Sequence, residues 1–185
     1  MVPPVFITGN QNKADYLQKL IDMPIDHQKV DLDEIQSTSL DAIVTHKVKQ
    51  AYEIVGRPVL VEDVALGFDA LSGLPGPFIK FFVDSDNGLE HLCRMLDGFS
   101  DRGAMAECMF GYYDGSRLEL LRGSLHGQIS DHPRGHGGYG WDKVFSPDGW
   151  EGKTRAEFTP EEDEQTYQTI KPIAQLRELL RTLEN

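Results

Sequence analysis

Residues 59–63 have the sequence Val59-Leu60-Val61-Glu62-Asp63, and this stretch indicates the fold class more directly than any other. Three consecutive apolar residues are typical of a strand that is buried on both faces, as the central strands of α/β sheets are. On this prediction the strand ends at Glu62 and Asp63. Ligands bind beyond the carboxyl ends of such strands, so we expect two carboxylates at a functional edge.

The segments on either side alternate between strand and helix patterns. We expect a strand at 5–7 that is broken by Thr8-Gly9-Asn10, a helix with apolar positions from Ala14 to Ile21, and a second strand ending near Leu32. A long helix capped by Thr38 or Ser39 ends at Gly56, and strands at 104–113 and 118–129 form a hairpin. A helix covering 173–183 ends the chain, and this order predicts a mixed α/β sheet.

The composition predicts one globular domain that covers residues 1–185. The chain has 39% hydrophobic residues and a formal net charge of -12. This charge disfavours nucleic acid and membrane partners, but a bound divalent cation would still allow a small phosphorylated ligand. Two cysteines, no signal peptide pattern and no apolar stretch of about 18 residues predict a cytoplasmic protein.

Two lysine-bearing segments are candidate phosphate sites. Thr8-Gly9-Asn10 separates a strand from a helix, where backbone N–H groups can hold an anion, and Lys13 adds a positive charge in the first helical turn. The alternative is a capped helix with a surface lysine. Lys47 borders the apolar stripe of its helix, so it points either into a cleft or along the surface.

Three acids are candidate metal ligands. Glu34 follows the second predicted strand, and Glu62 and Asp63 follow the buried one. Mg²⁺ binds hard oxygen ligands, often one or two carboxylates together with substrate phosphates. We expect the pKa of one of these neighbouring acids to be raised, so that it accepts a proton from an attacking water. The alternative is that each acid caps the following turn.

The tetrapeptide Tyr139-Gly140-Trp141-Asp142 is a candidate base-binding segment. Its aromatic rings can stack on a planar base, and the Asp142 side chain can accept hydrogen bonds from the edge of that base. The alternative is a loop whose rings fill a small core. The acidic run at 161–164 is predicted to be a solvated stretch before the last helix.

Three blocks in this order resemble the inosine triphosphate pyrophosphatase family. They are Thr8-Gly9-Asn10 with Lys13, the segment from Val61-Glu62-Asp63 to Gly76-Pro77, and Pro133-Arg134-Gly135 followed by Tyr139-Gly140-Trp141-Asp142. The resemblance implies an elongated mixed central sheet with two lobes flanking a nucleotide cleft, usually in a homodimer. It also implies attack of a metal-bound water on the α-phosphorus, which gives a nucleoside monophosphate and pyrophosphate.

The predicted site follows from these residues and from the resemblance. We assign catalysis to Asp63, Lys13 and Glu62, Mg²⁺ binding to Glu34 and Asp63, and substrate binding to Thr8, Gly9, Asn10, Lys13, Lys47, Tyr139, Gly140, Trp141 and Asp142.

The end of the chain departs from the family pattern. Tyr167-Gln168-Thr169 stands where the family has Ser-His-Arg, and Asp163-Glu164 stands where it has Lys-Asn. Lys143 and Lys171 are candidates to replace the lost donors. We therefore predict retained hydrolysis of noncanonical purine nucleoside triphosphates such as ITP, dITP or XTP, with altered base choice. The alternative is a catalytically weakened nucleotide-binding sensor or interaction module of the same fold.

Overall fold

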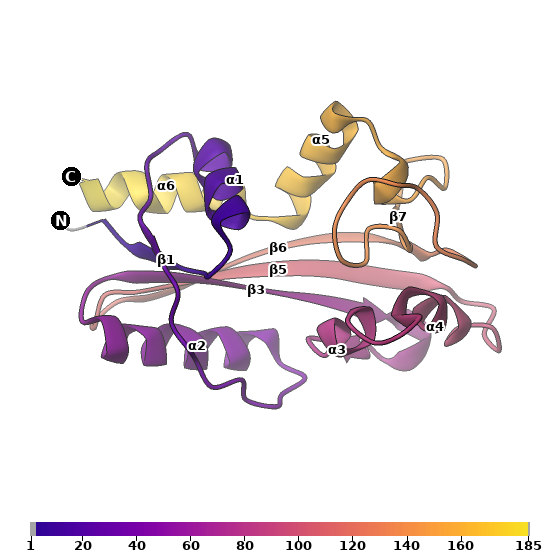
Figure 1. Cartoon of the computed structure of the whole chain (residues 1–185), viewed down its shortest axis with the longest axis horizontal. Coiled ribbons are helices and arrows are strands. Elements are labelled where there is room, and N and C mark those ends of the chain that lie inside the picture. Colours follow the sequence, from indigo (N-terminus) through magenta and orange to yellow (C-terminus); the bar gives the residue numbers. More distant parts are fainter. Residues whose placement is uncertain (1–2, 185) are drawn as a thin grey trace. The chain divides into compact units, whose positions relative to one another are not determined.

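The chain folds into the predicted mixed α/β architecture. The computed structural model describes residues 3–184, and in this range a seven-stranded sheet has the order β2-β1-β3-β5-β6-β7, with β4 paired to β3 (Figure 1). Strand β1 is parallel to β2 and β3, whereas β3–β4 and β6–β7 are antiparallel. The sheet is therefore mixed, as the sequence predicts.

Two compact units make up the described chain. Within the described range, the first unit contains residues 3–63, 108–123 and 171–184, and the second contains 64–107 and 124–170. Three of the four boundaries fall inside β3, β5 and β6, so these strands contribute residues to both units, and the fourth lies between residues 170 and 171. The prediction of a single domain over 1–185 stays a prediction.

The first unit is a set of strands with helices on both faces. Helix α2 lies on one face of the strands, and α1 and α6 lie on the other (Figure 1). At Gly111 of β5 an added Cβ would lie 2.5 Å from Val44 of α2, so this glycine allows the helix to approach the sheet closely. The elements are β1 (Val5–Ile7), α1 (Gln11–Ile21), β2 (His27–Gln28), α2 (Leu40–Val55), β3 (Val59–Phe68), β5 (Gly103–Tyr113), β6 (Leu118–Ile129) and α6 (Ile173–Glu184).

Local sequence explains where the two helices near the candidate site begin. The Asn10 side chain accepts a hydrogen bond from the Lys13 backbone N–H at 3.2 Å, which caps α1. Ser39 caps α2 in the same way through the Ala42 N–H at 3.3 Å, and Gly56 ends that helix with a φ of 71°. The predicted cap at Ser39 and the stop at Gly56 are confirmed.

Two strand predictions are wrong. Strand β3 does not end at Glu62 and Asp63 but continues to Phe68, because the buried apolar residues that follow extend the strand. The strand expected to end near Leu32 is the two-residue β2 at His27–Gln28, and the exposed acids after it lie outside regular structure. Glu62 and Asp63 are therefore interior residues of a ten-residue strand.

The second unit surrounds the remaining parts of the long strands. Its core is tied together by the Arg102 guanidinium, which donates to the carbonyl oxygens of Cys93 (2.7 Å), Ile129 (2.8 Å) and Ser130 (2.8 Å). Its other elements are the short 3-10 helices η1 (Asp69–Leu71) and η2 (Arg155–Glu157), strands β4 (Pro75–Gly76) and β7 (Phe145–Pro147), and helices α3 (Ile79–Val83), α4 (Gly88–Arg94) and α5 (Pro160–Ile170).

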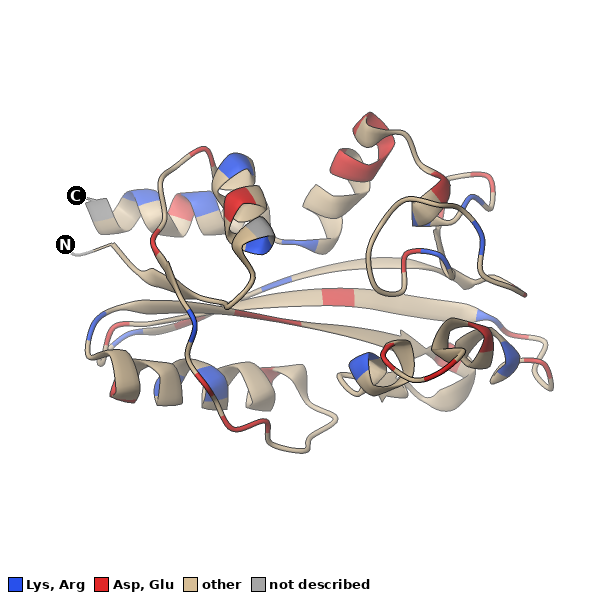
Figure 2. Ribbon diagram, viewed as in Figure 1, with Lys and Arg blue, Asp and Glu red and all other residues tan. Residues whose placement is uncertain are grey.

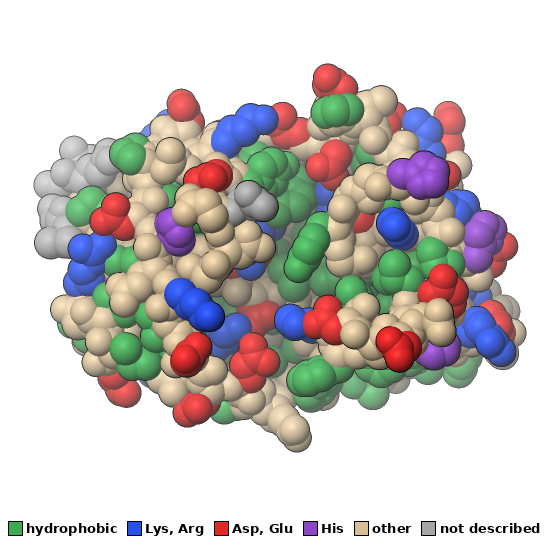
Figure 3. Space-filling view, in the orientation of Figure 1, with side chains coloured by type: hydrophobic (Ala, Val, Ile, Leu, Met, Phe, Trp, Pro, Cys, Tyr) green, Lys and Arg blue, Asp and Glu red, His purple; other side chains and the backbone are tan. Residues whose placement is uncertain are grey.

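The acidic run at 161–164 lies before the last helix with Glu161 and Glu164 exposed, as predicted, but it is itself helical and belongs to α5. Figure 2 shows these acids on α5. Glu162 accepts a hydrogen bond from the Thr159 N–H at 2.9 Å, and acids in a first turn are stabilised by the helix dipole. Elsewhere the acidic side chains are scattered among basic and apolar ones over the face that Figure 3 shows.

Candidate functional site

The loop between β1 and α1 leads into the start of a helix and is fixed by hydrogen bonds of its own, beginning with the Thr8 N–H, which donates to the Gln28 carbonyl oxygen. The Thr8 hydroxyl accepts a hydrogen bond from the Asn10 N–H at 3.1 Å, and Asn10 then caps α1. At Gly9 an added Cβ would lie 3.0 Å from the Lys29 side chain, so a larger residue would crowd that stem. The structure therefore brings Thr8, Gly9, Asn10 and Lys13 together, as the sequence predicts.

A buried ionic cluster lies beside this loop. Glu62 Oε1 is 3.0 Å from Lys13 Nζ, and Glu62 Oε2 is 2.7 Å from Lys171 Nζ. We call Lys13, Glu62 and Lys171 the two-lysine cluster. The side chains of Glu62 and Lys171 are 2% and 8% exposed, whereas that of Lys13 is 37% exposed. Lys171 Nζ also lies 5.9 Å from the centre of the Phe110 ring, within the range of a cation–π contact.

Electrostatics makes Glu62 a firmly ionised acid. Burial acts to raise its pKa, but the charges and hydrogen bonds of Lys13 and Lys171 outweigh burial and lower the pKa to about 2. With one negative and two positive charges, the two-lysine cluster carries a net charge of about +1. A positive cluster in an acidic chain is suited to bind an anion.

Asp63 lies on the other face of the same strand. Its Oδ2 is 2.9 Å from Nζ of Lys47, which belongs to α2, and both side chains are about one fifth exposed. Successive residues of a strand point to opposite faces, in agreement with the positions of α1 and α2 on the two sides of β3 (Figure 1). Lys47 therefore points to the sheet and not along the surface, and it holds Asp63 in place.

The structure corrects several expectations about the candidate metal ligands and about Lys171. Glu62 and Asp63 point to opposite faces and do not form a pair, and the pKa of Glu62 is lowered where we expected a raised value for one neighbour. Lys171 binds Glu62, so its predicted role as a replacement donor for the base is not supported by its contacts. Glu34 is exposed in the segment before α2. Within residues 3–184 no group of three or more His, Cys, Asp or Glu side chains is arranged to hold a metal ion.

The glycine-rich loop of the second unit positions Asp142. The Asp142 side chain is buried, and its Oδ2 accepts a hydrogen bond from the Tyr139 N–H at 2.7 Å. At Gly138 an added Cβ would lie 2.5 Å from that of Asp142, so only glycine allows this packing. Tyr139 is 88% exposed, and Gly140 has a φ of 61°. The Trp141 ring is half-buried, and its Nε1–H is buried with no partner among the described residues.

Arg155 is a residue that sequence reasoning missed. Its side chain is 4% exposed, with Nη1 3.2 Å from Asp142 Oδ1, and Nη2 donates to Asp163 Oδ1 of α5. We call Asp142, Arg155 and Asp163 the arginine cluster. The sequence pattern Thr154-x-x-Glu157 could have indicated this position. It is a capping box that fixes the short helix η2, to which Arg155 belongs.

The arginine cluster sets the protonation of Asp142. Burial raises the pKa of Asp142 above its ordinary value, the Arg155 charge and the Tyr139 N–H act to lower it, and Asp163 adds to the raising. The net direction is upward, opposite to that of Glu62.

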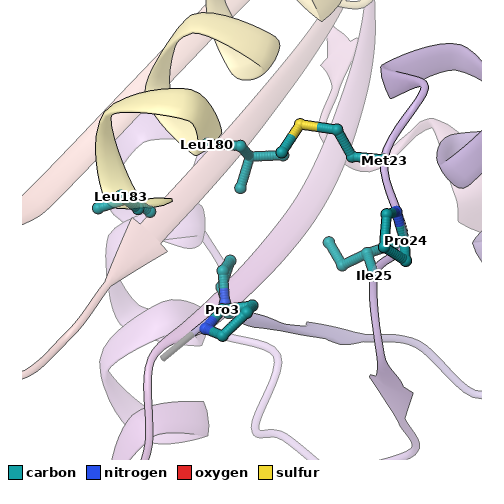
Figure 4. A pocket seen from close by; sticks show the side chains of 7 residues that line it. Pro3, Met23, Pro24, Ile25, Leu180 and Leu183 are labelled. Atoms are coloured by element: carbon teal, nitrogen blue, oxygen red, sulfur yellow. The ribbon is translucent and has the colours of Figure 1, made fainter. Parts of the chain in front are cut away.

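The first unit also has a pocket of about 90 Å³, and its lining is apolar, unlike the charged clusters. Pro3, Met23, Pro24, Ile25, Leu180 and Leu183 line it, together with Pro4 (Figure 4). Its lining has no charged or hydrogen-bonding side chain, so it is unsuited to bind a nucleotide. No helix among residues 3–184 has the length and hydropathy of a membrane span.

Comparison with known proteins agrees with the resemblance found in the sequence. A model of the Ham1 family matches residues 4–179. The chain is 44% identical over 179 residues to a protein of Emericella nidulans named inosine triphosphate pyrophosphatase, covering 95% of this chain and 94% of that protein. It is 41% identical over 174 residues to inosine triphosphate pyrophosphatase 2 of Trypanosoma cruzi, covering 92% and 88%.

Solved structures show the same fold. The Ham1 protein of Staphylococcus aureus superposes with a TM-score of 0.82 at 22% identity, covering 96% of this chain and 97% of that one. A HAM1 protein of Coxiella burnetii gives a TM-score of 0.81 at 25% identity, covering 99% and 98%. The fold and the sequence together define a mixed α/β protein of the Ham1 type. The chain belongs to the Ham1 family, and the predicted membership is confirmed.

Proposed function

We propose that this protein is a Mg²⁺-dependent nucleoside triphosphate pyrophosphohydrolase that acts on noncanonical purine nucleotides such as ITP, dITP and XTP. The observation that carries the proposal is the two-lysine cluster next to the α1 start, in a chain whose relatives are named inosine triphosphate pyrophosphatases. The product pair is the nucleoside monophosphate and pyrophosphate.

The proposed phosphate site combines two sources of positive potential. The positive end of the α1 helix dipole lies next to Thr8, Gly9 and Asn10. The Thr8 and Asn10 N–H groups themselves are used within the chain, by the Gln28 carbonyl oxygen and the Thr8 hydroxyl. Lys13 extends from the next turn, with its ammonium group partly exposed. Because Lys171 also neutralises Glu62, the Lys13 charge is not cancelled by that acid and is available to a phosphate.

The residues proposed for Mg²⁺ fit that ion in kind. Glu34 and Asp63 offer hard carboxylate oxygens, and Mg²⁺ in nucleotide sites is commonly held by one or two carboxylates with the phosphates completing its shell. When bound, the ion neutralises charge that develops on the phosphates. Glu34 and Asp63 are the residues that would hold it.

Asp63 is the proposed general base. The Lys47 ammonium group 2.9 Å from Oδ2 fixes the orientation of the carboxylate, and Asp63 accepts the proton of the attacking water. The water oxygen forms a bond to the α-phosphorus, and the bond from that phosphorus to the bridging oxygen breaks. Pyrophosphate leaves with that electron pair.

The proposed base contacts come from the loop of Tyr139, Gly140, Trp141 and Asp142. The unpartnered Trp141 Nε1–H and the buried Asp142 carboxyl supply a donor and an acceptor beside an exposed ring. Since Tyr167-Gln168-Thr169 replaces the Ser-His-Arg of the resemblance, we propose that the contacts that set base choice are altered. Cytoplasmic location and a homodimer stay predictions.

A pyrophosphate-release assay over a panel of nucleotides tests this function. We expect release from ITP, dITP or XTP with Mg²⁺, none after chelation with EDTA, and a loss of about 10²-fold to 10⁴-fold in kcat for Asp63→Asn, which removes the base. Asp26→Asn, a surface acid paired with Arg57, is the matched control and should retain full activity. No release from any nucleotide by the unaltered protein would contradict the proposal, and binding without turnover would favour the sensor alternative.

A further inference from the structure

Arg155 is buried in an arrangement that hydrogen bonding alone does not explain. Its guanidinium joins Asp142 in the loop and Asp163 in α5, and its Cζ lies 5.3 Å from the centre of the Tyr167 ring. Its Nε–H is buried and has no partner among the described residues. A buried guanidinium with an unsatisfied donor costs free energy, so the role of its contacts to Asp142 and Asp163 needs an explanation beyond packing.

The contacts of Asp142 show which property Arg155 controls. Oδ2 is engaged by the Tyr139 N–H, and Oδ1 faces Arg155, with the Asp163 carboxylate on the far side of the guanidinium. Burial and Asp163 favour the neutral acid, and Arg155 is the charge that opposes them. An ionised carboxylate only accepts hydrogen bonds, whereas a neutral carboxyl also donates one.

This difference matters for the edge of a purine. Purines with a 6-oxo group, such as hypoxanthine, xanthine and guanine, carry a hydrogen on N1, so their edge donates there. Adenine has a lone pair on N1 and accepts there. An acceptor at Asp142 therefore suits a 6-oxopurine, and a donor at Asp142 suits adenine.

We propose that Arg155 is the positioning residue that determines base choice, because it holds Asp142 as a hydrogen-bond acceptor and so selects 6-oxopurine nucleotides over adenine nucleotides. This inference rests on the proposed function and names its substrate class. Arg155 acts through Asp142 and is not itself a catalytic residue. Since guanine shares the N1 hydrogen, this arrangement does not reject guanine nucleotides.

The test is the ratio of kcat/KM for ITP to kcat/KM for ATP, measured as pyrophosphate release between pH 5.5 and 9. For Arg155→Met we expect the ratio to fall about tenfold or more at pH 6 and to recover toward high pH as Asp142 ionises. Arg155→Lys keeps the charge and should retain part of the preference. Arg102→Met removes a partly buried, hydrogen-bonded guanidinium of the same unit, lowers stability and should leave the ratio unchanged.

Asp163→Asn tests the same point with Arg155 in place, should the methionine variant fail to fold. Removing this acid lowers the pKa of Asp142, so the acidic limb of the ratio profile should move to lower pH. An unchanged ratio at every pH in Arg155→Met, or an unmoved profile in Asp163→Asn, overturns the inference. If the unaltered protein releases no pyrophosphate from any nucleotide, the proposed function itself fails, which is a distinct result.

Discussion

Each of the two charged clusters has one central charged side chain between two side chains of the opposite charge, and the signs are reversed between the clusters. In the two-lysine cluster one acid lies between two lysines, and the pKa of Glu62 falls to about 2. In the arginine cluster one guanidinium lies between two acids, and the pKa of Asp142 rises. The surplus charge differs accordingly, positive in the first and negative in the second.

This contrast supports the different roles proposed for the two clusters. A surplus of positive charge suits phosphates, and a carboxylate that accepts hydrogen bonds suits the N–H edge of a base. Burial alone would raise the pKa of both acids, so the number of cations around each acid decides the direction.

Removal of Lys171 should have the largest effect on stability. Lys171→Met leaves the buried Glu62 with one of its two cations, and we expect a loss of roughly 3 to 5 kcal/mol in the free energy of unfolding. Denaturant unfolding at pH 7 measures it. Lys19→Met, at an exposed lysine of α1, is the control and should change stability little. Equal effects of the two variants would show that the buried pair is not a stabilising feature.

The pH dependence of stability should have opposite signs in the two clusters. Glu62 has a lowered folded pKa, so its contribution is present above its ordinary pKa of 4.5 and is lost as pH falls toward about 2. The advantage of the unaltered protein over Glu62→Gln should therefore be roughly 2 kcal/mol smaller at pH 3 than at pH 7.

Asp142 should behave in the opposite way. Its folded pKa is raised, so its contribution is present below its ordinary pKa of 3.8 and is lost as pH rises through the folded value. Asp142→Asn should gain stability relative to the unaltered protein as pH rises from 3 to 7. Unfolding curves across this range check both variants, and slopes of the same sign would contradict the comparison.

An exposed ion pair should show the smallest effect. Arg117 Nε lies 2.8 Å from Glu119 Oε1, as close as the pairs in either cluster, but both side chains are more than one third exposed. Arg117→Gln should leave the free energy of unfolding almost unchanged, and salt should weaken the small effect further. A loss as large as that of Lys171→Met would mean that burial does not distinguish these pairs.

Local patterns were sufficient to predict much of the fold and part of the candidate site. Asn10 and Ser39 cap helices where the sequence indicates, and Lys13 lies in the first turn behind the Thr8 loop. These features depend on residues within a few positions of each other. The sequence does not predict that β3 extends past Glu62. Glu62 and Asp63 are accommodated inside the strand because Lys13, Lys47 and Lys171, which come from other elements, pair with them.

Long-range pairing accounts for the remaining errors. Lys171 meets Glu62 across 109 positions, and no local pattern indicates that contact. The opposite orientation of Glu62 and Asp63 follows from strand geometry once β3 is known to continue through them. Arg155 was missed because its partners, Asp142 and Asp163, lie on two different elements.

The products formed from ITP show which phosphate bond the protein cleaves. Phosphorus NMR of ITP incubated with the protein and Mg²⁺ distinguishes cleavage at the α-phosphorus from cleavage at the γ-phosphorus. We predict equal amounts of IMP and pyrophosphate, with no IDP at any time. Formation of IDP and orthophosphate, or intact ITP after prolonged incubation, would contradict the account.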